Sequence, residues 1–230
     1  MYPYLFGNEH LKMYDIIGVF GYVLIFAFYL HHKNRFALAQ EGKYCWWPLL
    51  LVQCVAFTFG GEWLGSQIGR ATEFYGFLGL SAVFIVLLAV SVAGYPLRWL
   101  DDTVPLYLTL ASVLKLGCFC SGCCYGLPWP WGMYNSRCDQ TQFPMQLAEA
   151  VAYGLLLWAL WRYRGKTGQR FALCVSGYAA IRFAVQFFRG DRPIFSAFHW
   201  MSAVVAAVGA ALWLVCGLVR TPKQAAKNNE

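Results

Sequence analysis

Apolar runs of membrane-spanning length, separated by short polar connections, recur along the whole chain. A helix that crosses about 30 Å of hydrocarbon needs roughly 20 predominantly apolar residues. We therefore expect an all-α, polytopic membrane helical bundle with seven transmembrane helices, forming one domain over residues 1–230. The expected spans are 13–30, 46–65, 74–95, 104–125, 143–161, 171–188 and 198–218.

The composition also indicates a membrane protein rather than a soluble one. Hydrophobic residues make up 59% of the chain and charged residues only 13%, whereas soluble domains contain about 25% charged residues. The formal net charge of +7 does not indicate a nucleic-acid partner, because the basic residues lie in short clusters between apolar runs. No internal repeat is evident, which disfavours a transporter built from inverted repeats.

The distribution of Lys and Arg predicts the orientation of the bundle. Eleven of the 18 basic residues fall on one predicted side, five on the other and two inside spans. Because cytoplasmic loops carry the excess of positive charge, we expect a cytoplasmic C-terminus and an outer N-terminus. The N-terminal stretch has no basic segment or cleavage site, so the first run is expected to remain a membrane helix. The connection 128–142, PWPWGMYNSRCDQTQ, is expected to be an outer loop at the lipid interface.

Two cations, Lys115 and Arg182, are expected near the middle of spans four and six. A charge at that depth is costly unless it is paired or wet, so both are functional-site candidates. Glu149 in span five is the one acid clearly expected inside, which leaves an excess of positive charge. That excess predicts an anionic ligand such as a lipid phosphate. The alternative is an Arg182–Glu149 ion pair that only links two helices.

In the fifth and sixth predicted spans, polar residues share one helical face. Arg182, Gln186 and Arg189 follow at i, i+4 and i+7, and so share a helical face. A phosphate entering from the outer leaflet would meet Arg189 first, and a guanidinium binds phosphate oxygens through its planar donor fork. Gln146 and Glu149 share a face at i and i+3. Gln146 is expected to face a polar interior or to form a hydrogen bond between helices.

The stretch 115–128, KLGCFCSGCCYGLP, holds four cysteines. Their spacing differs from paired CxxC knuckles and no histidine lies nearby, so we expect no metal. A disulfide between adjacent cysteines would be strained, which disfavours a redox pair. If the helix were continuous, Cys120, Cys123 and Cys124 would share a face and Cys118 would point elsewhere.

Small residues recur in the same stretch at Gly117, Ser121, Gly122 and Gly126. Such spacing lets helices approach closely, and glycines can also expose backbone donors to an anion. We therefore expect a packed, partly opened helix beside a lipid headgroup.

Three motifs, in this order, resemble those of the prolipoprotein diacylglyceryl transferase family, bacterial enzymes that move a diacylglyceryl group from phosphatidylglycerol to a lipoprotein cysteine. KLGCFCSGCCYG is similar to GRxGNFxNGExxG, FPMQLAEA to HPSQLYEA, and GYAAIRFAVQFFR to GYGxxRxxxEFFR. The resemblance implies a multi-pass transferase of the bacterial cytoplasmic membrane without a cofactor. It implies phosphatidylglycerol as lipid substrate and a lipoprotein precursor as partner.

The resemblance also implies which residues form the site. Those expected to be catalytic are Arg182, Lys115, Tyr75 and Glu149. Those expected to bind substrate are Arg189, Gln146, Gln186, Gly117, Ser121, Gly122, Gly126, Cys118 and Cys123.

Several positions depart from the family pattern, and the phosphate-binding part is better matched than the acid–base part. The departures, with the family residue in parentheses, are Lys115 (Arg), Cys118 (Asn), Ser121 (Asn), Cys123 (Glu), Tyr75 (His), Gln186 (Glu) and Phe20 (Tyr). Three alternatives therefore stay open: a related transferase with another acceptor, a thiol-redox membrane protein that uses the cysteines 118–124, and a lipid-binding or transport protein.

Overall fold

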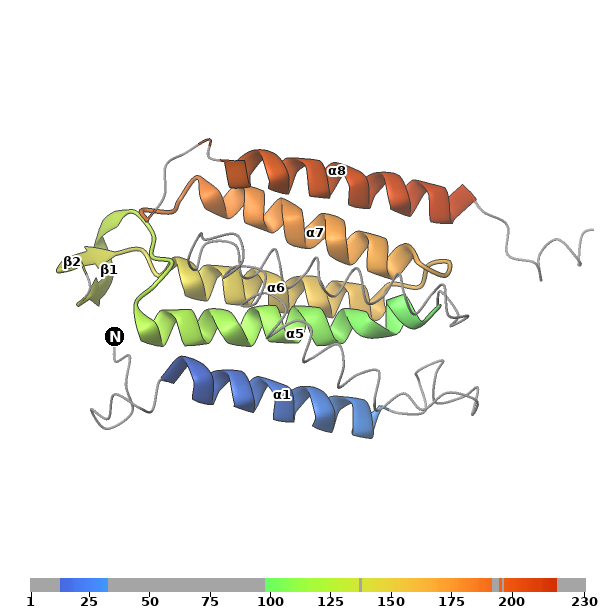
Figure 1. Ribbon diagram of the computed structural model, residues 1–230, viewed down its shortest axis with the longest axis horizontal. Coiled ribbons are helices and arrows are strands. Elements are labelled where there is room, and N and C mark those ends of the chain that lie inside the picture. The colour runs from blue at the N-terminus through green and yellow to red at the C-terminus, as the bar shows by residue number, and fades with distance from the viewer. Residues whose placement is uncertain (1–12, 33–97, 137, 192–194, 196, 219–230) are drawn as a thin grey trace, which may run out of the picture. The chain divides into compact units, whose positions relative to one another are not determined.

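A computed structural model describes residues 13–32, 98–136, 138–191, 195 and 197–218. These residues form five helices and one two-stranded hairpin (Figure 1). The helices are α1 Met13–His31, α5 Arg98–Ser121, α6 Met145–Arg162, α7 Gln169–Gln186 and α8 Ala197–Leu218. The predicted spans 46–65 and 74–95 lie outside the described residues, so the number of spans stays a prediction.

Four helices agree with the predicted spans to within two residues at each end. The fourth predicted span, 104–125, differs more, because α5 begins at Arg98 and ends at Ser121. Gly122 follows with φ of 68°, the left-handed conformation that glycine adopts at helix C-termini. The helix therefore stops four residues early, and the motif residues beyond 121 lie on a turn.

The connection expected to be an outer loop at the lipid interface contains a short β-hairpin, within a fold that is otherwise mainly helical as predicted. Strand β1, Pro128–Asn135, pairs antiparallel with β2, Gln140–Gln142, and Tyr134 lies opposite Thr141. Aromatic residues and Thr favour strands, and this segment is rich in Trp and Tyr. The molecule is mainly helical, with this one hairpin among its described residues.

The chain divides into two compact units, 1–28 with 103–230, and 29–102. In the second unit, the Tyr29 hydroxyl donates a hydrogen bond to the backbone carbonyl of Asp102. Most of that unit lies outside the described residues, so the prediction of a single domain remains untested.

In the first unit, small residues mark the close helix contacts. A methyl group on Gly21 of α1 would lie 3.0 Å from Val113 Cγ1 of α5. Ser112 of α5 donates a hydrogen bond to the Ala150 carbonyl of α6 at 2.8 Å. Ser176 of α7 donates similarly to the Ala206 carbonyl of α8 at 3.0 Å. Small residues and hydroxyl groups of this kind are typical of helix pairs in membranes.

Two of the described helices, over Leu100–Ser121 and His199–Leu218, are long and apolar enough to cross a membrane. In the apolar segment of the second helix, only 6% of the residues are buried within the protein. Helix α6 likewise exposes Val151, Leu155 and Trp158 on one face, at i, i+4 and i+7. Contiguous apolar faces of this size are unfavourable in water and suit contact with lipid.

Candidate functional site

Three charged residues from three helices meet in the first unit. Glu149 of α6 has a side chain only 1% exposed. Its Oε1 accepts a hydrogen bond from Arg182 Nη1 of α7 at 2.5 Å, and its Oε2 forms an ion pair with Lys115 of α5. Residues separated by 33 and 34 positions are thus joined by one carboxylate.

This trio retains a positive charge. The Lys115 and Arg182 side chains are 13% and 20% exposed, so both are largely removed from solvent, and they share a single negative charge. Partial burial strengthens their electrostatic effect on a bound group. The arrangement suits an anion that reaches the exposed side of the two cations.

Arg189 lies beyond the end of α7, which corrects the prediction that it continues the helical face of Arg182 and Gln186. Helix α7 ends at Gln186. The Arg189 guanidinium makes a bidentate contact with Asp191, with Nε–Oδ1 at 2.8 Å and Nη2–Oδ2 at 2.5 Å. Its side chain is 1% exposed, so Asp191 already occupies much of the donor fork expected to meet a phosphate first.

The backbone around Arg189 is tied to the segment that follows α5. Gly126 and Arg189 form an isolated β-bridge. Leu127 N–H donates to the Phe188 carbonyl at 3.0 Å, and Gly190 N–H donates to the Tyr125 carbonyl at 3.0 Å. These bonds fix the ends of α5 and α7 beside each other.

Two amide side chains hold the turn after α5. Gln146 Nε2 donates to the Cys123 carbonyl at 2.6 Å. Asn135 Nδ2 donates to the Gly122 carbonyl at 3.0 Å and to Gln142 Oε1 at 3.1 Å. Gln146, Asn135 and its partner Gln142 are all buried. Asn135 and Gln142 were not expected from the sequence, because they lie outside the motifs and become neighbours only through the hairpin.

The small residues of the motif have local structural reasons. A methyl group on Gly117 would lie 3.0 Å from the Tyr14 ring of α1, and one on Gly126 would lie 2.6 Å from the Phe143 carbonyl. Gly122 supplies the positive φ of the turn, and Ser121 is the last residue of α5. Each glycine therefore allows a close approach or a turn that a larger residue would disturb.

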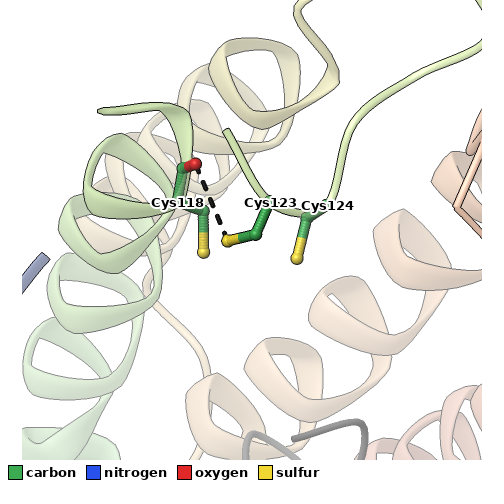
Figure 2. Close-up of side chains that lie close together, drawn as sticks. All are labelled: Cys118, Cys123 and Cys124. Atoms are coloured by element: carbon green, nitrogen blue, oxygen red, sulfur yellow. Dashed lines mark hydrogen bonds between the residues drawn. The ribbon is translucent and has the colours of Figure 1, made fainter. Parts of the chain in front are cut away.

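The cysteines are arranged differently from the prediction. Cys118, Cys123 and Cys124 have sulfur atoms that all lie within 4.8 Å of one another, and Cys120 is not part of this group. Figure 2 shows the three side chains together, with the Cys123 thiol donating to the Cys118 carbonyl at 3.7 Å. The prediction assumed a continuous helix, whereas the chain turns at Gly122.

The helix cap explains why Cys123 lies beside Cys118. Cys123 N–H donates to the Cys118 carbonyl and Gly122 N–H donates to the Phe119 carbonyl, both at 3.2 Å. These are the two bonds of a Schellman cap, in which side chains at the first and last of the six positions come into contact. The sequence signal is therefore a cysteine five positions before another cysteine that directly follows glycine.

An aromatic pair completes the surroundings of the charged trio. Tyr153 of α6 is fully buried and stacks on Tyr178 of α7 with ring centroids 5.0 Å apart. Tyr153 lies one turn beyond Glu149, a spacing that would have identified it.

Three further positions that depart from the family pattern are Gln186, Tyr75 and Phe20. Gln186 is 3% exposed. Tyr75 lies outside the described residues, and Phe20 of α1 is 58% exposed.

A family model for prolipoprotein diacylglyceryl transferase matches residues 16–215. A protein of Aromatoleum aromaticum named phosphatidylglycerol–prolipoprotein diacylglyceryl transferase is 32% identical over 228 residues, covering 89% of this chain and 76% of the relative. Proteins of the same name from Clostridium tetani and Bordetella avium are each 29% identical. Those alignments cover 55% and 79% of this chain, and 55% and 64% of the relatives, respectively.

The family match includes the trio, the turn and the helices that carry them, and the apolar exposed faces agree with a membrane protein. The chain belongs to the prolipoprotein diacylglyceryl transferase family.

Proposed function

We propose that this protein transfers a diacylglyceryl group from phosphatidylglycerol to the cysteine thiol of a prolipoprotein. The relatives carry that activity in their names. The observation that supports it most directly is the trio of Lys115, Glu149 and Arg182, in which two cations share one carboxylate. This arrangement suits the phosphate of an anionic phospholipid.

The reaction requires stabilisation of the negative charge on the departing phosphate and removal of the proton from the acceptor thiol. The acceptor sulfur attacks a glycerol carbon, a C–S bond forms, and the C–O bond to phosphate breaks, so that glycerol phosphate leaves and the thiol proton goes to a base. Arg182 and Lys115 are positioned to stabilise the charge on the departing phosphate. Preorganised donors in a largely dry site act strongly because little reorganisation is needed during the reaction.

Glu149 fits a positioning role in this scheme. Two cations contact its carboxylate and stabilise the ionised form, which makes it a weak proton acceptor. It holds Lys115 and Arg182 at a shared location between the helices. We therefore assign the base that accepts the thiol proton to Tyr75, at the position where the family has a histidine, or to a group on the acceptor.

The substrate-binding assignments follow from the same end of the bundle. Gln146 holds the turn through the Cys123 carbonyl, and Gly122 and Gly126 permit its shape. Arg189 is paired with Asp191, so it contributes directly only if a headgroup displaces that carboxylate. The proposed binding set is completed by Gly117, Cys118, Ser121, Cys123 and Gln186.

The finer topology is part of the proposal. Seven spans, an outer N-terminus and a cytoplasmic C-terminus in the bacterial inner membrane would place the hairpin end outward. The basic connection between α6 and α7, with Arg162, Arg164, Lys166 and Arg170, would face the cytoplasm. On this topology the trio would lie toward the outer leaflet. Lys115 and Arg182 would therefore be shallower than the mid-membrane depth expected from the sequence, because they lie near the ends of α5 and α7, which end at Ser121 and Gln186.

The test is an assay of purified protein with phosphatidylglycerol and a lipobox peptide, read by mass spectrometry of the peptide and of released glycerol phosphate. Arg182→Ala is expected to reduce turnover by about 100-fold or more. Arg170→Ala is the matched control, because Arg170 lies near the start of the same helix and donates to the Tyr163 carbonyl.

Unchanged turnover in Arg182→Ala would contradict the site. Release of glycerol phosphate without peptide modification would contradict the prolipoprotein acceptor and favour a related transferase with another acceptor. No lipid-derived product from the wild-type protein would contradict the transferase proposal.

A further inference from the structure

The proposed transfer assigns no chemical step to the thiols of Cys118, Cys123 and Cys124. Their sulfur atoms lie within 4.8 Å of one another, none of the three is part of a disulfide, and all three are partly buried. Figure 2 shows them on the end of α5 and the turn that follows it. Three sulfurs bound to a common ion at about 2.3 Å would lie roughly 4 Å apart, so only a small inward movement would bring them to that geometry.

The backbone that presents these thiols is tightly held. The Schellman cap brings Cys123 to Cys118. Cys124 has φ of 57°, a conformation that is uncommon for a residue other than glycine and persists only where its surroundings enforce it. Gln146 and Asn135 bind the two preceding carbonyls. The thiols are thus fixed by contacts from α6 and the hairpin, which is the preorganisation that a binding site needs.

Positively charged side chains lie near the cluster. Lys115 and Arg189 both act electrostatically on Cys124, and the trio carries more positive than negative charge. Thiolates are the form that binds metals, and nearby cations promote them. Thiolates at this location would also offset the unpaired positive charge.

We propose that Cys118, Cys123 and Cys124 form a binding site for a soft metal ion, with Cu(I) as the ion that fits the donor set. Soft thiolate ligands select Cu(I), zinc or iron–sulfur clusters. Structural zinc sites use four ligands, whereas this group provides three among the described residues. Binding releases one proton from each thiol that is protonated beforehand and leaves the oxidation state of sulfur unchanged.

Binding of the ion would affect the neighbouring trio. A Cu(I)–thiolate group is anionic, so it would compete with a phospholipid headgroup for the charge of Lys115. The metal site therefore acts as a regulatory site if the proposed transferase function holds, and its existence does not depend on that function.

The experiment titrates reduced, full-length protein in lipid nanodiscs with Cu(I), without oxygen and against a chromophoric Cu(I) chelator. One ion per chain is expected. A variant that keeps only Cys118, Cys123 and Cys124, with the other six cysteines changed to Ser or Ala, should bind with wild-type stoichiometry. Cys123→Ser and Cys124→Ser should each abolish chelator competition, whereas Cys120→Ser should match wild type. Zn(II) is titrated in parallel and should bind more weakly.

A second readout does not depend on variants that fold. Alkylation of the wild-type protein with iodoacetamide, followed by peptide mass mapping, should show that Cu(I) protects the three cluster cysteines and leaves Cys120 and Cys138 reactive.

A further variant tests the support of the turn. Gln146→Leu, which frees the turn, should weaken Cu(I) binding about 10- to 100-fold. Equal binding after loss of all three cysteines, no protection of the cluster, or a disulfide within it in reduced protein would overturn the proposal.

Discussion

Arg182 of α7 donates a hydrogen bond from Nη1 to Oε1 of Glu149 in α6 at 2.5 Å. The same carboxylate pairs with Lys115 of α5, so three helices depend on one acidic side chain for charge balance. Breaking a buried ion pair by removing one partner costs more than the pair itself contributes, because the remaining charge stays buried.

Glu149→Gln should therefore be strongly destabilising. It leaves two cations side by side, and we expect a loss of about 3 kcal/mol or more together with loss of transfer activity. The measurement is the apparent Tm in detergent with turnover measured in parallel. The double variant Glu149→Gln/Lys115→Met removes one of the opposed cations and should recover part of the Tm without recovering turnover. A single variant as stable as wild type would contradict the described ion pairs.

Lys115→Met should separate binding from stability. It leaves a one-to-one pair between Glu149 and Arg182, so the Tm should change little, while the KM for phosphatidylglycerol should rise. Lys115→Arg keeps the charge and places the arginine of the family motif at this position, so it should keep most of the activity. An unaltered KM in Lys115→Met would argue that the lipid phosphate does not use this cation.

Gly126→Ala should disturb the link between the end of α5 and the start of α6. Its new methyl group would lie 2.6 Å from the Phe143 carbonyl oxygen, and a backbone atom cannot move aside as a side chain can. The apparent Tm should fall. Gly154→Ala in α6 is the control, since a methyl there meets nothing within 4 Å and Ala is favoured over Gly in a helix by about 1 kcal/mol. The Tm of that control should rise.

Gly209→Ala should separate α8 from α7. The added methyl group would lie 2.6 Å from the Ser176 backbone nitrogen, which prevents the close approach that the Ser176–Ala206 hydrogen bond requires. We expect a lower Tm with turnover per folded molecule retained, because the trio lies on α5, α6 and α7. Gly209→Ser tests size further and should be worse. A wild-type Tm in both variants would contradict the α7–α8 contact.

His199→Leu should preserve stability. His199 is 1% exposed and contacts the rings of Phe183, Phe187 and Phe195. Neither ring nitrogen has a hydrogen-bond partner among the described residues, so an apolar side chain removes the cost of burying unpaired polar atoms. A clear fall in Tm would mean that the imidazole forms a polar contact in the folded protein.

Patterns in the sequence predicted the features that depend on interactions between neighbouring residues, such as the helix ends. The ends of α1, α6, α7 and α8 could be placed from apolar run length alone, since a helix needs only neighbouring residues to form its backbone hydrogen bonds. The candidate cations and Glu149 could also be identified, because charge is conspicuous in apolar sequence. The hairpin was missed, since its two strands become stable only through pairing with each other.

The cysteine cluster shows the limit more sharply. A continuous helix would have grouped Cys120 with Cys123 and Cys124, whereas a single left-handed residue at Gly122 turns the chain and brings Cys118 to them instead. The glycine was visible in the sequence, but the conformation it adopts depends on the contacts from Asn135 and Gln146 that hold the turn.

By itself, the sequence determined the apolar helices, the order of the motifs and the presence of more buried cations than acids, because these follow from composition and short-range spacing. Only the tertiary structure decided that Lys115 and Arg182 share Glu149, that Arg189 is held by Asp191, and which three thiols meet. Those relationships join residues on different helices or across a turn, and the packing of the helices sets which of the available charges and thiols come within reach of one another.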